Sequence, residues 1–539
     1  MLERHRDGIR EPGGCPAGRA PAPWRSPRGW LAVGTAVLAG SALMVSGAAP
    51  ASAAGGNNAN PQGVLKYGVD LNDTFSNTFD PGASTDDCSY AEYTGVFDSL
   101  LSPSNTTVKP LLAASYTSTP TSITFHLQPG ATFSNGDPVT AATVAASIDH
   151  IKASPFRFSL TYIQSIQQVN PETITFTLNK PVAGDVLWAM TYIDGMQVDP
   201  AALPSTSTVP ASSGPFTLAN YQQGSSILLK ANPTYWNKSA YKLGGVNFVQ
   251  VSPGPQEISA LETGAVDMLP IQPEDYAAVK SLPNVGIATT QSEDYLVMQT
   301  RQNQAPFNDP KVRAAMEYAV DRKGINNAVF SGLGQAAYQP FPSWTAGYNK
   351  TVGNKYTYQP AKAKALLAAA GHPHGISFTL VIPSGTATFN RTAQILQAEM
   401  AAAGFKMTIQ QVNPTDLFTD VYEHGQGDAV LTAELTNGPD LANNFEAEYT
   451  GIGFAGRELG DTNAAITPLV DTALTSLSPS VQGPPMRKAS GIVMATGTEV
   501  PLIFEPSVVA YNKNRVGGTV VAPIGECRSN LSGIYIKKG

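Results

Sequence analysis

Short runs in which apolar and polar residues alternate recur along the first half of the chain. Leu65–Asn72 (LKYGVDLN) and Ser122–Leu127 (SITFHL) follow the period of a β-strand. Ser213–Trp236 (SGPFTLANYQQGSSILLKANPTYW) holds two such runs around a polar turn with a glycine. That order predicts a β-hairpin stopped by a proline. Thr140 precedes a segment rich in Ala and Val, so we expect it to cap a helix there.

The second half of the chain shows a helical period. Asp309-Pro310 begins a helix whose apolar face carries Val312, Ala315, Met316, Ala319 and Val320. Tyr358–Gly375 predicts another helix, ended by Gly371. Asn390–Val412 predicts helix, glycine and strand in succession. Alternating helices and strands indicate an α/β fold with a parallel or mixed sheet.

The N-terminus has the pattern of an export signal. Six arginines up to Arg28 precede an uncharged, mostly apolar run, Trp30–Val45, and the small residues Ala51-Ser52-Ala53 follow. These are the three regions of a cleaved secretory signal peptide, which we place at residues 1–53. A membrane anchor is the alternative, but the run is shorter than the ~20 residues that span a bilayer.

The length and net charge of the chain limit its number of domains and the kinds of partner it can bind. Removal of residues 1–53 changes the net charge from −7 to −10, which argues against nucleic acid and anionic membranes as partners. The remaining 486 residues exceed the ~250–300 residues at which single domains stop growing. We therefore expect an exported, soluble protein with two lobes or more.

Only two cysteines remain after signal removal, Cys88 and Cys527. An isolated pair in an exported chain indicates one disulfide, which would tie the start of the chain to its end. Two buried free thiols are the alternative.

Catalytic and metal-binding motifs are missing from the sequence: it has no G-x-S-x-G, H-E-x-x-H, C-x-x-C or phosphate-binding loop. His372 and His374 are close enough to share a metal, but they follow a helix end and are better explained as a solvated loop. Glu434, Asp440, Glu446 and Glu448 could supply a glycosidase pair or a polar wall. We favour the wall, and expect no enzyme, no cofactor and no metal.

Several ordered motifs resemble one family. Gly-Pro-aromatic followed by Asn-Pro-x-Tyr-Trp within Ser213–Trp236, and the run that starts at Asn308-Asp309-Pro310, are similar to the extracellular solute-binding proteins, family 5 (the peptide and nickel class), of bacterial ABC importers. The resemblance extends from about Leu65 to Tyr535. It implies a periplasmic-binding-protein-like fold: two α/β lobes, an extra subdomain in the first lobe, and a ligand cleft between the lobes.

The resemblance also implies the domain boundaries. Lobe I is expected in pieces, with lobe II between the third and the fourth. The expected lobe I pieces are 54–101, 102–209 (the extra subdomain), 210–300 and 498–539, and lobe II is 301–497.

The resemblance also implies some of the residues that contact the ligand. Gly438-Pro439-Asp440 and Asn444-Phe445 match the family, but the aspartate that pairs with a peptide amine in relatives is missing near Leu435 to Asn437. A neutral residue cannot offset the desolvation of a buried ammonium as a carboxylate does. Our candidate ligand-binding residues are Asn437, Asp440, Glu434, Arg391, Trp344 and Tyr90.

The implied function is an ABC-import receptor that captures a small polar ligand, first of all a peptide, by hinge closure. An oligosaccharide or other metabolite receptor is the alternative ligand class, and a secreted hydrolase or a receptor for a sensor are alternative functions. Expected partners are the permease and ATPase subunits, with the protein itself a monomer. Ala48 stands where relatives carry a lipid-bearing cysteine, so the resemblance implies a cleaved extracellular or envelope-associated protein without a lipid.

Overall fold

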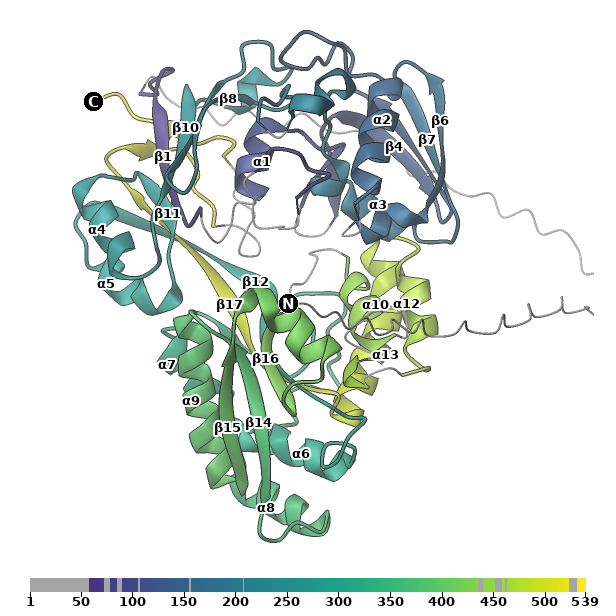
Figure 1. Ribbon diagram of the computed structural model, residues 1–539, viewed down its shortest axis with the longest axis vertical. Coiled ribbons are helices and arrows are strands. Elements are labelled where there is room, and N and C mark those ends of the chain that lie inside the picture. Colours follow the sequence, from purple (N-terminus) through teal and green to yellow (C-terminus); the bar gives the residue numbers. More distant parts are fainter. Residues whose placement is uncertain are drawn as a thin grey trace, which may run out of the picture. The chain divides into compact units, whose positions relative to one another are not determined.

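The computed structural model describes residues 58–71, 78–84, 90–104, 107–154, 157–206, 208–434, 440–450, 458–460, 463–522 and 531–539 (Figure 1). The predicted signal peptide, Cys88 and Cys527 lie outside these residues. Export and the disulfide therefore stay predictions. Within the described part, no helix is long and apolar enough to cross a membrane.

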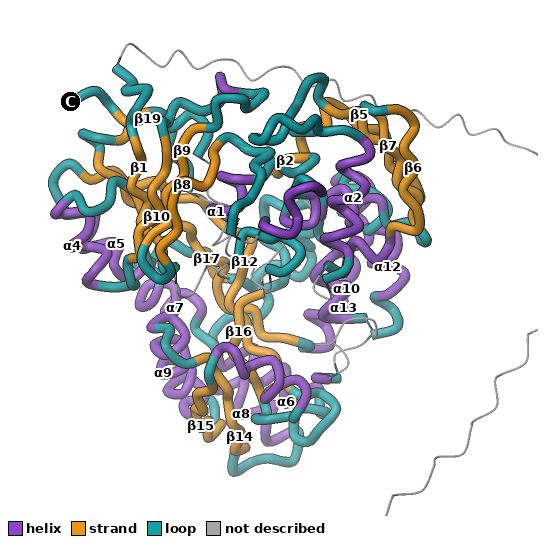
Figure 2. Tube along the Cα trace, turned by 45° about the horizontal axis from the view of Figure 1, so that its top comes forward, coloured by secondary structure: helices purple, strands orange, loops and turns teal. Residues whose placement is uncertain are grey.

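One large mixed sheet forms the framework of the molecule. β1 pairs in parallel with β10 and β11, whereas β12 pairs antiparallel with β16 and β17. Across the sheet the order is β15 (Phe405–Val412), β14 (Ile376–Pro383), β16 (Ala429–Glu434), β12 (Val285–Thr300), β17 (Glu499–Asn512), β11 (Met268–Pro270), β1 (Val64–Val69), β10 (Gly245–Gln250), β9 (Ser226–Ala231) and β8 (Phe216–Gln222), with β13 (Gln335–Ala336) beside β17. β1, β8, β9 and β10 lie together in Figure 2. The predicted mixed α/β sheet is confirmed.

Two strands, β12 and β17, connect the halves of this sheet. They are the longest strands described, and β17 pairs with β11 at one end and with β13 nearer the other. The β12–β17 register shifts between Gln291 and Tyr295. The second half of β12, from Tyr295, also pairs with β16.

A separate four-stranded antiparallel sheet follows β3 in the chain. Its order is β4 (Ala113–Thr119), β5 (Ser122–Leu127), β7 (Thr173–Leu178) and β6 (Ile163–Asn170). α2 (Ala141–Lys152) and α3 (Ala183–Ala189) lie near it and share its core, together with residues from the later part of the chain such as Leu474. We call this sheet with α2 and α3 the small-sheet unit. It falls inside the predicted extra subdomain, whose boundaries stay predictions.

The remaining helices and short strands complete the fold. α9 packs on β14 and β15, and α7 packs against α9 and β17. The helices are α1 (Tyr90–Val96), α4 (Pro255–Thr263), α5 (Tyr276–Lys280), α6 (Pro310–Ala319), α7 (Arg322–Val329), α8 (Pro360–Ala369), α9 (Ala387–Ala402), α10 (Asn443–Tyr449), α12 (Thr467–Ala473) and α13 (Pro479–Thr496). The short strands are β2 (Leu101–Pro103), β3 (Val108–Pro110), β18 (Val516–Gly517) and β19 (Tyr535–Ile536).

The starts of two helices were predicted correctly from local signals. The Thr140 side chain accepts from the Thr143 amide and caps α2, and Asp309 accepts from the Lys311 amide at the start of α6. The predicted apolar face of α6 is fully buried. Side-chain caps of this kind satisfy amides that have no partner inside the helix.

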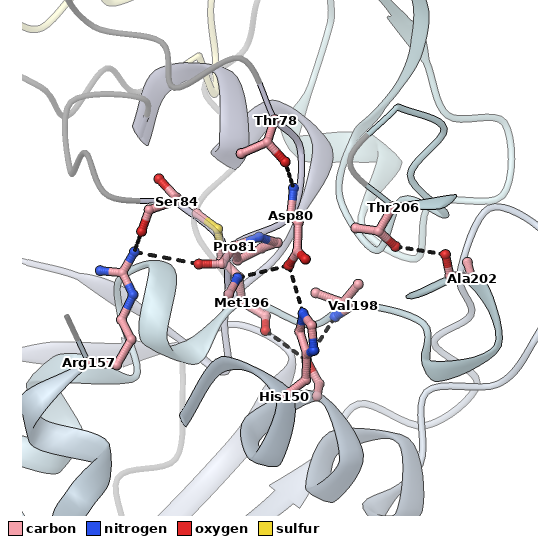
Figure 3. Close-up of polar contacts among 12 residues, drawn as sticks. Thr78, Asp80, Pro81, Ser84, His150, Arg157, Met196, Val198, Ala202 and Thr206 are labelled. Carbon is pink, nitrogen blue, oxygen red and sulfur yellow. Dashed lines mark hydrogen bonds and ion pairs between the residues drawn. The ribbon is translucent and has the colours of Figure 1, made fainter. Parts of the chain in front are cut away.

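Polar contacts hold the loop Thr78–Ser84 to the small-sheet unit (Figure 3). Asp80 Oδ1 lies 2.7 Å from His150 Nε2 and also accepts from the Gly82 amide. Arg157 Nη2 donates to the Ser84 carbonyl at 2.9 Å. The loop is thereby joined to α2 and to the segment that follows α2.

Candidate ligand-binding site

Glu434, a predicted ligand residue, ends β16 inside a buried polar cluster. Its neighbour across the sheet is β12, where the Gln299 amide nitrogen donates to Glu434 Oε1 at 2.8 Å and to Glu448 Oε2 at 2.9 Å. The Tyr422 hydroxyl donates to Gln299 Oε1 at 3.2 Å. Burial raises the pKa of Glu448, while hydrogen bonds with Gln299 and Glu434 oppose that rise.

A third carboxyl, Glu499 at the start of β17, adjoins this cluster. It accepts from the Tyr295 hydroxyl at 3.1 Å and from the Tyr449 hydroxyl at 2.6 Å. Burial raises the pKa of Glu499 to about 8, because desolvation disfavours the charged form. We call Gln299, Glu434, Glu448 and Glu499, with these tyrosines, the strand-crossing cluster.

Trp344, another predicted ligand residue, has an indole that is 45% exposed beside the same strands. Its ring packs on Phe504 with centroids 6.1 Å apart, and Phe504 packs on Tyr295 at 5.6 Å. Burial raises the pKa of Glu293 to about 8, Asp294 adds to the rise, and a hydrogen bond with Trp344 opposes it. An exposed aromatic face beside a carboxyl can contact both apolar and donor groups of a ligand.

Pairing across the sheet explains how Glu434 and Trp344 come into one region. Tyr295 lies opposite Glu434 on β16 and opposite Phe504 on β17. The structure therefore places these two predicted residues at the two ends of one row, with Tyr295 and Phe504 between them. Gln299, Glu293 and Glu499, which the sequence did not single out, lie beside it.

The other predicted residues lie elsewhere or outside the description. Arg391 on α9 is exposed and donates to the Ala328 carbonyl at 3.0 Å. Asp440 is buried, and its Oδ1 accepts from the amides of Ala442 and Asn443 at the start of α10. Asn437 lies outside the described residues, as does the side chain of Tyr90, whose backbone begins α1. All four stay predictions as ligand contacts.

Tyr235 and Trp236, at the end of the hairpin Ser213–Trp236, have a structural role. The Tyr235 hydroxyl and the Trp236 indole each donate to Asp98 Oδ2 at 2.9 Å. Burial raises the pKa of Asp98 to about 7, and these two bonds oppose the rise. The hairpin is thus joined to the loop after α1.

Metal binding finds no support among the described residues, where no group of three or more His, Cys, Asp or Glu could hold an ion. His372 and His374 lie in the turn after α8, and His374 is exposed.

Comparison with known proteins agrees with this architecture. Residues 107–454 match the model of bacterial extracellular solute-binding proteins, family 5 Middle. Glutathione-binding protein GsiB of Escherichia coli (strain K12) is 25% identical over 473 residues, which cover 83% of this chain and 91% of that protein.

Two solved structures share the fold. The ABC transporter-associated periplasmic binding protein DppA from Helicobacter pylori, in complex with peptide STSA, is 22% identical with a TM-score of 0.73, over 88% of this chain and 98% of its own. The ABC transporter substrate binding protein CtaP from Listeria monocytogenes is 20% identical with a TM-score of 0.76, over 88% and 99%. These likenesses confirm the predicted two-lobed fold, and the family match covers most of the chain. The chain belongs to the family 5 bacterial extracellular solute-binding proteins.

Proposed function

We propose that this protein is the solute receptor of an ABC import system, and that a peptide is its ligand. The family and the names of its relatives support a binding role: GsiB is named for glutathione, and the DppA structure holds a peptide. No step of the proposed mechanism makes or breaks a covalent bond. The permease and ATPase subunits are the proposed partners, and the receptor acts as an exported monomer.

Closure of the two lobes would occur by bending of β12 and β17. These strands are shared by both halves of the sheet, and their register shift at Gln291 to Tyr295 interrupts the regular ladder between the halves. A few residues that absorb a change in backbone angles are sufficient for a hinge. Ligand would shift the population toward the closed form through contacts that only this form makes.

The observation that carries the proposal is the row of side chains from Glu434 through Tyr295 and Phe504 to Trp344. Buried carboxyls of the strand-crossing cluster are held by an amide and phenols, which are uncharged donors. An ammonium group of a ligand would replace such donors with a charge-assisted bond, which is about twice as strong. Glu434 would thus take the place of the aspartate missing near Leu435 to Asn437.

An oligosaccharide is the second candidate ligand, and the exposed Trp344 indole favours it. Sugar faces pack on exposed aromatic rings, and their hydroxyls donate to carboxyls. A sugar, unlike a peptide, would not need an ionised Glu434.

Thermal unfolding of the full-length gene product tests the ligand class. Pooled di- to pentapeptides are offered with free and with acetylated N-termini, and a set of oligosaccharides is offered in parallel. Ligand at 100 times its Kd adds about 2.7 kcal/mol to the folded state, so a bound class raises the Tm clearly. Stabilisation by free-amine peptides alone supports Glu434 as the amine partner. Indifference to all peptides would contradict the proposal.

Variants then locate the site. We expect Glu434→Gln to lose at least about tenfold in affinity for free-amine peptides and little for acetylated ones. Trp344→Ala is expected to weaken both sets, because it removes apolar contact rather than charge. The matched control is Glu257→Gln, which removes a buried carboxyl near the start of α4. It is expected to leave the affinity for both sets of peptides unchanged.

A further inference from the structure

The small-sheet unit contacts α10 and α12 through a group of polar side chains, in addition to the apolar core that they share. Lys180 Nζ lies 2.9 Å from Glu446 Oε1, and the Tyr162 hydroxyl donates to the same carboxyl at 3.1 Å. Asn443 Nδ2 donates to Asp185 Oδ1 at 2.6 Å. We call Tyr162, Lys180 and Asp185, with Asp440, Asn443 and Glu446 opposite them, the latch contact. α3 and α10 face each other in Figure 1.

The backbones also touch at this face. The Gly184 amide donates to the Leu474 carbonyl at 2.9 Å. A Cβ on Gly184 would lie 2.8 Å from that oxygen, closer than real Cβ atoms approach. Gly184 is in the first turn of α3, where amides have no partner inside the helix. Its hydrogen bond therefore reports this contact alone.

Two aspartates at the latch contact each leave one oxygen unused. Oδ2 of Asp185 and Oδ2 of Asp440 are buried without a hydrogen-bond partner among the described residues, and so is Nε2 of Gln482. Gln482 lies beside Asp440, since its Oε1 accepts from the Leu441 amide. Buried polar atoms are nearly always paired, and a proton on an aspartate would remove the charge from a carboxyl whose oxygen has no donor.

Electrostatics favour a proton here. Burial raises the pKa of both aspartates; Asp185 raises that of Asp440 further, and Glu446 raises both. The other charged or titratable groups facing the pair are Lys180, whose charge lowers the pKa of Asp185, and Tyr162, which also faces Asp471. Lys180 is already paired with Glu446, and hydrogen bonds from Asn443 and Ser159 lower the pKa of Asp185 only in part.

We propose that Asp185 or Asp440 holds a proton when the small-sheet unit meets α10, and that loss of this proton releases the latch contact. The inference rests on the proposed function, because the contact joins segments of the two predicted lobes and would form as they close. Once the surfaces separate, both carboxyls meet water and return toward ordinary aspartate pKa values. Closing therefore takes up a proton, and the contact weakens as pH rises.

Amide hydrogen exchange of Gly184 in the ligand-free, full-length protein tests the proposal. Protection factors, corrected for intrinsic exchange, are measured from about pH 5 to about pH 8.5, and uptake of one proton changes the ratio of closed to open up to tenfold per pH unit. We expect the wild-type protection factor to fall at least about tenfold over this interval. Amides of β9, in the core of the large sheet, show whether the whole protein has unfolded.

Neutral variants separate the proton from the contact itself. Asp440→Asn keeps an oxygen to cap α10 and removes the charge, so its Gly184 protection is expected to stay within about twofold across the same range. Asp185→Asn serves if that variant does not fold. Glu257→Gln removes another buried carboxyl whose pKa burial raises to about 8, outside this contact, and is expected to retain the wild-type dependence.

The outcomes divide cleanly. A Gly184 protection factor that does not change with pH in the wild type would overturn the proposal. So would a fall of this protection factor in Asp440→Asn and Asp185→Asn that equals the fall in the wild type. The peptide melting experiment is independent of Gly184 exchange. Peptide stabilisation with flat Gly184 exchange would contradict the latch alone, whereas a falling protection factor without any peptide effect would contradict the ligand assignment alone.

Discussion

Asp98 and Asp440 are both buried aspartates whose pKa values are raised by burial, but their surroundings differ. Around Asp98, the Tyr235 hydroxyl and the Trp236 indole come from one hairpin and point at the carboxyl. At Asp440 one oxygen accepts from amides at the start of α10 and the other has no partner in the described part, while Asp185 of the small-sheet unit raises its pKa further. A satisfied carboxyl fixes two elements together, whereas an unsatisfied pair suits surfaces that separate.

The largest expected effect, and the strongest test of this comparison, is the pH dependence of the free energy of unfolding that Asp98 causes. Because the folded-state pKa of Asp98 is about 7, above that of an ordinary aspartate, stability from its acid form is present at low pH and is lost as pH rises toward 7. Relative to Asp98→Asn, which mimics the acid form, wild-type stability should fall by up to about 1.4 kcal/mol per pH unit in that interval. Urea unfolding at several pH values measures the difference, and a constant difference would show that Asp98 stays ionised.

Asp98→Ala should be the next largest effect. It leaves the Tyr235 hydroxyl and the Trp236 indole N–H without their acceptor, and unpaired buried donors cost ~1–3 kcal/mol each. We expect a loss of about 3 kcal/mol in the free energy of unfolding at low pH. Asp98→Asn is the control, since its oxygen can still accept from both donors. Equal losses in both variants would refute the hydrogen-bond explanation.

Lys180→Met should produce a smaller effect at the latch contact. Lys180 is 30% exposed, and Glu446 keeps the Tyr162 hydroxyl as a donor, so a loss of about 1 kcal/mol or less is expected. Gly184 protection should fall by no more than about fivefold at pH 5. Lys242→Met, in the loop before β10, is the matched control. A loss of Gly184 protection as large as full opening would show that the ion pair, and not the aspartates, holds the contact.

Arg391→Ala should have the smallest effect on stability, within about 0.5 kcal/mol. Its exposed side chain donates to a single carbonyl, that of Ala328. If Arg391 holds a ligand carboxylate, as predicted, affinity for peptides with a free C-terminus should fall at least about tenfold while amidated peptides bind as before. Calorimetry with both forms measures this, and an equal change in both would remove Arg391 from the site.

Local elements were predictable from the sequence because their causes are local. The hairpin Ser213–Trp236 became β8 and β9, and Asp309 began α6 where its proline predicted. β12 is longer than its apolar pattern indicates: the apolar run begins at Tyr295, but the strand starts at Val285. The early part is only partly buried, since its side chains lie between core and solvent, and so it shows no clear alternation.

The site was predictable only as separate residues. Glu434 and Trp344 were chosen from sequence, but their meeting depends on the register of β12, β16 and β17, which come from distant parts of the chain. The latch contact joins residues 258 positions apart, Asp185 and Asn443. No periodicity or motif encodes such a pairing, because it results from tertiary packing.

A substitution at Gly184 offers a way to control the proposed closure of the receptor. A single methyl group at this position would act as a wedge between α3 and the Leu474 carbonyl, where only hydrogen fits. Gly184→Ala should therefore hold the two surfaces apart while leaving every proposed ligand contact intact. A receptor that cannot close could still bind its ligand in the open form. It would show whether a transporter accepts ligand from a receptor that never reaches the closed form.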